Sequence, residues 1–255
     1  MENFLQIILV SITQGITEFI PVSSSVHINL LSKIFDHRDV ELIINFSAHL
    51  GSLIAVIFFF REEIFKFSKN RNLFFKIIIS SIPLFVIGLI LIRYNLISKI
   101  RTLEIIGWTT ILFGFLLFIS DKFKTSQNIK RGFNIKNAIL IGFFQVLALI
   151  PGVSRSGIII TGVRFLKFNR VDAAKISFLY SIPALGGWSI YGLFDLIQQK
   201  NEILNIGALL TIFFSFVFSL LTIKYFLEYL KKFSLNIFVI YRLILGIILL
   251  LVAYL

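Results

Sequence analysis

Six apolar runs, each about 20 residues long, dominate the chain and limit the folds open to it. They cover residues 41–60, 74–92, 103–119, 173–196, 205–227 and 236–254. A helix of about 20 apolar residues is long enough to cross the hydrocarbon core of a bilayer. Of the residues, 57% are hydrophobic and only 15% are charged, whereas soluble domains are about 25% charged. The pattern predicts a single all-α membrane domain with six transmembrane helices.

Two further apolar stretches are each broken by a proline, at Pro21 and at Pro151. Their halves cover residues 3–20 and 24–34 in the first stretch and 137–150 and 156–166 in the second. These halves are too short to span comfortably, and non-helical backbone at membrane depth is tolerated where protein buries it. Each stretch is therefore predicted to be a re-entrant helix pair that enters and leaves on one side.

The two broken stretches are related by a constant offset. Gln14 and Gln145 are 131 positions apart, and so are Ser23 and Ser154. The chain is thus predicted to contain two diverged copies of one unit, about 1–125 and 126–255. Because each copy holds three crossings, an odd number, the second must be inverted relative to the first. The two proline breaks are then expected to meet near the midplane.

The basic residues predict the orientation. On one side of the six-helix arrangement lie 17 of the 25 Lys and Arg residues, in loops 61–76, 121–136, 164–175 and 224–232. The other side holds six. By the positive-inside rule the first side is cytoplasmic, both termini are external, and the first helix pair opens outward. The formal charge of +12 therefore fits topology signals and anionic lipid head groups, and nucleic acid is not expected as a partner.

Glu18 is a functional candidate because an acid at membrane depth costs roughly 2.5–3.5 kcal/mol on insertion scales. Gln14, four residues earlier, shares its helical face. Glu18 could hold a divalent cation, Mg²⁺ or Ca²⁺, against phosphate oxygens, or take part in proton transfer. The chain has no cysteine, so any metal would need oxygen or imidazole ligands.

The restarted helices offer an anion site, since a helix N-terminus presents unpaired N–H groups and partial positive charge. Arg155 adds a planar fork that matches a phosphoryl group. The serines could donate to phosphate oxygens or merely cap their helices, and the glycines permit close backbone approach. An ion pair between Arg155 and Glu18 is the structural alternative. The predicted phosphate-binding residues are Ser23, Ser25, Gly152, Ser154, Arg155, Ser156 and Gly157.

His27 lies three residues after Ser24, a spacing that on a helix would let it serve Ser24 as a base. Ser24 attacking phosphorus with His27 as base is the favoured mechanism; attack by His27 itself, or by a metal-activated water held by Glu18, are the alternatives. His37 is expected to be solvated. His49 is expected to bond a neighbouring helix or to face the cavity.

The stretches Gln14-Gly-Ile-Thr-Glu-Phe-Ile-Pro-Val-Ser-Ser-Ser-Val-His27 and Pro151-Gly-Val-Ser-Arg-Ser-Gly157 resemble the two signature motifs of bacterial undecaprenyl-diphosphate phosphatases of the bacitracin-resistance type. The resemblance implies metal-dependent hydrolysis of undecaprenyl diphosphate to undecaprenyl phosphate. This would recycle the lipid carrier of cell-wall synthesis on the outer side of the cytoplasmic membrane. It assigns catalytic roles to Glu18, Ser24, His27 and Arg155.

Two positions depart from the pattern that this resemblance implies. Gln14 stands where family members can have glutamate, which puts a two-carboxylate metal site in doubt. Val26 stands where glycine is usual and could narrow the approach to His27. The competing class is a transporter or flippase of lipid phosphate or another anion, because inverted repeats with broken helices are also typical of alternating access. A homodimer is one assembly that the sequence leaves open.

Overall fold

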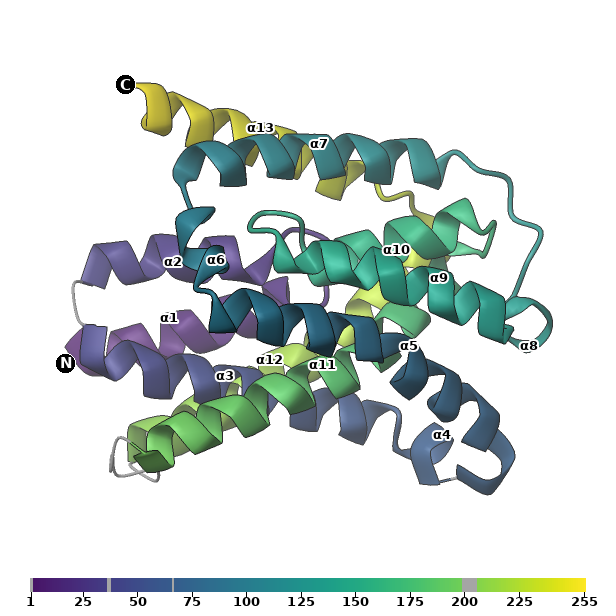
Figure 1. Ribbon diagram of the computed structural model, residues 1–255, viewed down its shortest axis with the longest axis horizontal. Coiled ribbons are helices and arrows are strands. Elements are labelled where there is room, and N and C mark those ends of the chain that lie inside the picture. The colour runs from purple at the N-terminus through teal and green to yellow at the C-terminus, as the bar shows by residue number, and fades with distance from the viewer. Residues whose placement is uncertain (1, 36–37, 66, 199–205) are drawn as a thin grey trace.

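The structure is a computed structural model that describes residues 2–35, 38–65, 67–198 and 206–255, and these residues are almost entirely helical (Figure 1). The longer helices are α1 (Glu2–Thr17), α2 (Ser24–Phe35), α3 (Arg38–Phe59), α5 (Phe67–Arg93), α7 (Leu103–Asp121), α9 (Ile135–Val146), α10 (Arg155–Phe165), α11 (Arg170–Gln198), α12 (Ile206–Lys232) and α13 (Asn236–Tyr254). Short helices connect them: α4 (Arg61–Phe65), α6 (Leu96–Lys99), α8 (Ile129–Gly132) and the 3₁₀ turn η1 (Leu147–Leu149).

Among the residues that the structure describes, four helices are long and apolar enough to cross a membrane. These segments are Asn72–Arg93, Leu103–Asp121, Ile206–Lys232 and Asn236–Tyr254. Their mean hydropathy is 1.9 to 2.6, yet only 22% to 33% of each most apolar window is buried inside the protein. Large apolar side chains such as Leu89, Trp108 and Phe213 therefore face outward. A surface of this kind suits lipid and not water, so the chain is a multi-pass membrane protein.

The helices lie mostly along one common direction (Figure 1). Helix α3 packs against α12 and α11, α7 packs against α13, and α10 lies between α11 and α7. Helix α1 runs along α12, and α9 runs along α5. The start of α1 and the end of α13 lie at the same end of the molecule, at the left of Figure 1, whereas α8 and the start of α9 lie at the opposite end. The two broken stretches therefore enter the helix bundle from opposite ends.

Glycine lets two of these helices approach closely. Gly142 on α9 faces the backbone of α5, where an added Cβ would collide with the Ser80 carbonyl oxygen. Tyr180, buried on α11, joins both helices: its hydroxyl lies 2.6 Å from Ser80 Oγ and donates to Ala138 O at 2.9 Å. In a membrane, where lipid competes equally for apolar surface, such close contacts and buried hydrogen bonds hold helices together.

Candidate active site

The first break follows α1, which ends at Thr17. The Glu18 amide still donates to Gln14 O at 3.0 Å, and Pro21, which has no N–H group, then prevents the helix from continuing. Ser23 has a φ of 75°, a left-handed conformation uncommon outside glycine. The turn reverses the chain, so that α2 starts at Ser24 beside the end of α1.

The second break has the same plan after α9 and η1. Gly152 has a φ of +89°, and an added Cβ there would collide with Thr109 Oγ1, so both conformation and space require glycine. Ser154 has a φ of 70° and caps α10, its hydroxyl accepting a hydrogen bond from Gly157 N at 3.2 Å. Gly152 and Gly157, both predicted to allow close approach of a ligand, thus lie against protein side chains.

Glu18 is the centre of a polar cluster at the place where the breaks meet. Its Oε1 lies 2.5 Å from Arg155 Nη2, and its Oε2 accepts from Ser24 Oγ at 2.6 Å and from Gln14 Nε2 at 3.0 Å. Glu18 is 7% exposed and Gln14 is fully buried. The structure therefore brings Gln14, Glu18, Ser24 and Arg155 together, including the ion pair that was the structural alternative for Arg155.

The remaining predicted serines tie the two loops to each other. Ser156 Oγ donates to Ile20 O at 2.8 Å, which links the second break to the first. The hydroxyls of Ser23 and Ser25 lie 3.3 Å apart, and those of Ser154 and Ser156 are also 3.3 Å apart. The corresponding hydroxyls of the two stretches thus have the same local arrangement.

Arg242 on α13 forms hydrogen bonds to backbone oxygens of both loops. Its side chain is fully buried and donates to Val153 O at 2.9 Å, to Gly152 O at 3.1 Å and to Thr110 O at 3.2 Å. A longer contact of 3.5 Å reaches Pro21 O in the first break. A buried arginine that binds only carbonyl oxygens adds an uncompensated positive charge, because within the described ranges no salt bridge to Arg242 is found.

His27 does not lie where the helical spacing predicts. Its Nδ1 is 2.7 Å from Ser23 O and its Nε2 is 2.5 Å from the Tyr241 hydroxyl, while the Ser24 hydroxyl donates to Glu18 instead. The predicted contact between His27 and Ser24 is therefore not formed in this geometry, and the role of His27 in the reaction stays a prediction. The reason is local: Ser24 is the first residue of α2 and follows the left-handed Ser23, so its side chain is directed back toward α1.

His49, the other histidine that the structure describes, forms its contacts with Asn45 and Trp188. His37 lies outside the described residues. His49 Nδ1 is 2.8 Å from Asn45 O, and its ring lies 6.1 Å from the Trp188 ring, so it bonds within its own helix and packs against α11.

The cluster keeps two buried polar atoms that lack a hydrogen-bond partner among the described residues: Gln14 Oε1 and Arg155 Nη1. A buried polar atom without a hydrogen bond destabilises the folded protein unless a ligand or a water molecule supplies the missing bond. A phosphate oxygen suits the guanidinium nitrogen, and an oxygen-seeking cation suits the amide oxygen. No group of three or more His, Cys, Asp or Glu side chains that could hold a metal occurs in the described parts of the chain.

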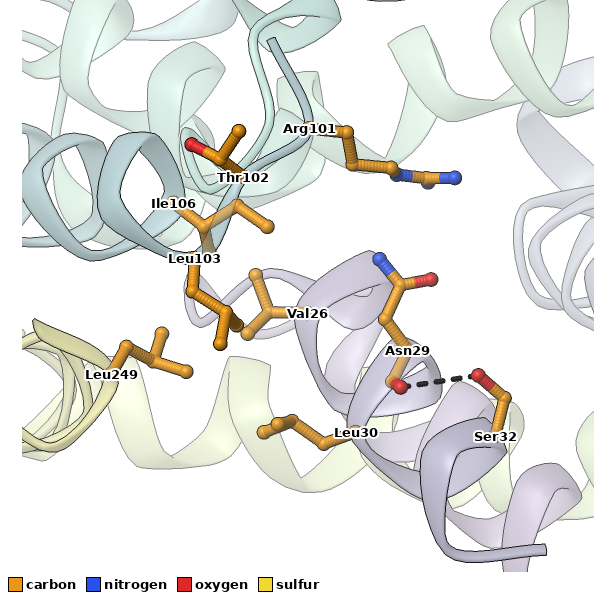
Figure 2. Close-up of a pocket in the computed structure, with 9 residues that line it drawn as sticks. All are labelled: Val26, Asn29, Leu30, Ser32, Arg101, Thr102, Leu103, Ile106 and Leu249. Carbon is orange, nitrogen blue, oxygen red and sulfur yellow. Dashed lines mark hydrogen bonds between the residues drawn. The ribbon is translucent and has the colours of Figure 1, made fainter. Parts of the chain in front are cut away.

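A cavity of about 410 Å³ lies between α2, the start of α7 and α13 (Figure 2). The apolar side chains Val26, Leu30 and Leu103 lie on one side of it, and the polar Asn29 and Arg101 lie on the other, as Figure 2 shows. Val26, where the resemblance implied glycine, packs with Ile106 and Leu249 in a small apolar cluster. None of the predicted site residues lines this cavity.

Sequence reasoning missed Tyr241 and Arg242, which follow each other on α13. Arg242 gave the same signal that identified Glu18, a charge within an apolar run of spanning length. Tyr241 gave no such signal, because tyrosine is common in membrane helices and its partner lies 214 positions away.

Comparison with known proteins identifies the family of this chain. The family model described as "Bacitracin resistance protein BacA" matches residues 7–248. A protein of Pelagibacter ubique named undecaprenyl-diphosphatase is 47% identical over 254 residues, 99% of each chain. Proteins with the same name from Dinoroseobacter shibae and Alteromonas mediterranea are 36% and 37% identical, over 99% and 97% of this chain and 99% and 98% of their own. The chain therefore belongs to the bacitracin resistance protein BacA family.

Proposed function

We propose that the chain hydrolyses undecaprenyl diphosphate to undecaprenyl phosphate and inorganic phosphate at the Glu18 cluster. The observation that carries this proposal is that one carboxylate, that of Glu18, contacts both a hydroxyl and a guanidinium where two broken helices meet. Nucleophile, base and anion-binding group are the parts that phosphoryl transfer requires. The family and the names of its curated members give the substrate.

Ser24 acts as the nucleophile in this mechanism, and Glu18 acts as its base. The Ser24 hydroxyl, 2.6 Å from Glu18 Oε2, gives up its proton to the carboxylate as its oxygen attacks the terminal phosphorus. The bond from that phosphorus to the bridging oxygen breaks, and undecaprenyl phosphate leaves with the electron pair. Glu18 then loses that proton to solvent and takes a proton from the water that attacks phosphorus; the bond from phosphorus to Ser24 Oγ breaks, which releases phosphate and restores the serine.

Arg155 binds the terminal phosphate and stabilises the charge that develops on it. Its Nη1 is buried and has no hydrogen-bond partner among the described residues, whereas Nη2 pairs with Glu18. A guanidinium in this position can hold phosphate oxygens while it keeps the carboxylate next to Ser24. Ser23, Ser25, Ser154 and Ser156 supply hydroxyls around the same place, and their loops present the start of α2 and α10.

A divalent cation, Mg²⁺ or Ca²⁺, is part of the proposal. The Glu18 carboxylate and Gln14 Oε1, which has no hydrogen-bond partner in the described parts of the chain, are oxygen donors of the kind such ions prefer. One or two protein oxygens are sufficient where substrate phosphate and water complete the coordination shell. When bound, the cation would neutralise charge on the diphosphate. Loss of activity with chelator, and its recovery with Mg²⁺ or Ca²⁺, tests this part.

The proposed topology is six crossings, two re-entrant pairs and inverted repeats of about 1–125 and 126–255. It is supported by the matched φ angles of Ser23 and Ser154, by the equivalent packing of α1 on α12 and α9 on α5, and by the opposite entry of the two pairs (Figure 1). The basic loops favour an inner-membrane protein with external termini and the Glu18 site open outward. Tags at the termini that label only after permeabilisation of spheroplasts would contradict this orientation.

Phosphate release by the purified protein in detergent tests the proposed function. A hydrolase releases phosphate from undecaprenyl diphosphate without any second compartment, whereas a transporter or flippase does not. Ser24→Ala should abolish release. If Ser24→Ala and His27→Ala each lose only a few-fold, neither side chain is the nucleophile and attack by water becomes the better mechanism. Molecular mass in the same detergent decides whether the chain forms a homodimer.

A further inference from the structure

His27 is held at both ring nitrogens, by one contact within its own stretch and one from a distant helix. Nδ1 lies 2.7 Å from the backbone oxygen of Ser23. Nε2 lies 2.5 Å from the hydroxyl of Tyr241 on α13. The two rings are nearly parallel, with an interplanar angle of 14° and centroids 5.7 Å apart. The imidazole therefore has little freedom to rotate.

These contacts determine where the protons of His27 lie. A carbonyl oxygen only accepts, so Nδ1 must carry the hydrogen that bonds Ser23 O. In the neutral ring Nε2 is then the acceptor, and the Tyr241 hydroxyl must donate to it. With Tyr241 removed, Nε2 would lose its partner and the ring would lose the contact that fixes its plane.

Tyr241 is the more exposed of the two residues that hold the ring of His27. It is 43% exposed, while the Ser23 anchor at the other nitrogen is 3% exposed. Its neighbour Arg242 holds the loop of the second break and reaches Pro21 in the first. Two consecutive residues of α13 thus help to fix the position of the start of α2. Arg242 does so through the loop that precedes α2, and Tyr241 does so through the imidazole of His27.

We propose that Tyr241 is a positioning residue of the phosphatase site, whose hydroxyl holds His27 in the Nδ1–H tautomer and at a fixed angle beside the Ser24 loop. This inference rests on the proposed function. Its effect on the reaction passes through His27, so the two residues are energetically coupled during turnover.

Tyr241→Phe is a mild test, because the ring remains and only a hydroxyl is lost from a half-exposed side chain. We expect kcat to fall about tenfold, the size expected for one hydrogen bond, with KM changed less than about twofold. The matched control is Tyr254→Phe on the same helix, which removes a hydroxyl bonded to Trp108 Nε1 far from the cluster. The control should keep wild-type kcat.

The double variant separates positioning from a general structural role. If Tyr241 acts through His27, Tyr241→Phe should slow the His27→Gln protein by less than about twofold. If Tyr241 had only a general structural role, the fold-losses in kcat of the two single variants would multiply in the double variant. Protein labelled with ¹⁵N-histidine, with His27→Gln used to identify the signals, provides a second readout. Wild type should show a protonated Nδ1 and a hydrogen-bonded, unprotonated Nε2, and Tyr241→Phe should shift the Nε2 signal.

The outcomes distinguish this inference from the function on which it rests. If wild type releases phosphate but Tyr241→Phe has unchanged kcat, unchanged His27 signals or losses that multiply with His27→Gln, the inference fails and the function stands. If wild type releases no phosphate from undecaprenyl diphosphate, the proposed function and the role of Tyr241 in it fail together.

Discussion

Ser23 and Ser154, 131 positions apart, share a left-handed backbone conformation, with φ of 75° and 70°. Each has its hydroxyl 3.3 Å from that of the serine two residues later. Residues other than glycine pay roughly 1–3 kcal/mol for such a conformation. The same strained turn at both breaks indicates that the direction in which each helix restarts matters to the site.

Arg155→Lys should lower turnover by about a hundredfold, because losing one donor to the developing charge typically costs about 3 kcal/mol. Lysine keeps the charge but loses the planar fork, of which Nη2 binds Glu18 and Nη1 has no partner among the described residues. Phosphate release in detergent measures this. Arg170→Lys is the control, since Arg170 pairs with Asp121 away from the cluster. Near wild-type turnover in Arg155→Lys would refute the role of the fork.

Glu18→Gln should reduce kcat by roughly a hundred- to ten-thousandfold, the range expected for a lost general base. The amide keeps the shape of the side chain, but it cannot take the Ser24 proton and it leaves Arg155 without its counter-charge. Glu228→Gln is the matched control, because Glu228 is exposed and pairs with Lys231 on the surface. A Glu18→Gln protein that turns over normally and keeps its response to chelator would remove Glu18 from the mechanism.

Arg242→Leu should destabilise the protein by about 3 kcal/mol or more, because it leaves buried carbonyls of two loops without a donor. Unfolding in detergent, monitored by circular dichroism, measures the loss. The exposed Arg93 provides the control, and Arg93→Leu should change stability little. Equal unfolding temperatures for the two variants would show that Arg242 does not support the loops.

Gly142→Ala should cost about 1–3 kcal/mol or more, since its Cβ would overlap the Ser80 carbonyl and push α9 away from α5. Gly186→Ala is the matched control, because an added Cβ there meets no atom within 4 Å. In a helix interior alanine is otherwise favoured over glycine. The two substitutions should therefore change the unfolding temperature in opposite directions, and a stabilised Gly142→Ala protein would contradict the close contact.

Helix positions could be predicted largely from apolar periodicity, and the differences have physical causes. Helix α13 has the predicted bounds, Asn236–Tyr254. Helix α12 extends to Lys232 instead of stopping at 227, because its last turns are polar yet still helical outside the apolar run. The length of an apolar run gives the part of a helix that lies at membrane depth. It does not show how far the backbone hydrogen bonds of the helix continue beyond the membrane. The short helices α4, α6 and α8 lie in loops and carry no such signal.

The candidate-site residues that could be predicted are those with a charged side chain at membrane depth, Glu18 and Arg155. Contacts that depend on the direction of the backbone at a turn could not be predicted. The spacing of Ser24 and His27 predicted a contact because residues three apart face each other in a regular helix. Ser24, however, begins its helix after a left-handed turn, and it meets Glu18 six positions earlier. Such a turn is known only once the chain path is known.

The ion pair between Glu18 and Arg155 has a consequence for product release. In the resting protein the guanidinium already has a carboxylate partner at 2.5 Å. A bound phosphate must share Arg155 with that carboxylate. The Glu18 carboxylate therefore competes with inorganic phosphate for the guanidinium. Because the nearby carboxylate offsets part of the positive charge of the guanidinium and repels an anion, the affinity for phosphate is lower than that of an unpaired arginine. We therefore expect inorganic phosphate to be a weak inhibitor, and the site to empty readily after each turnover.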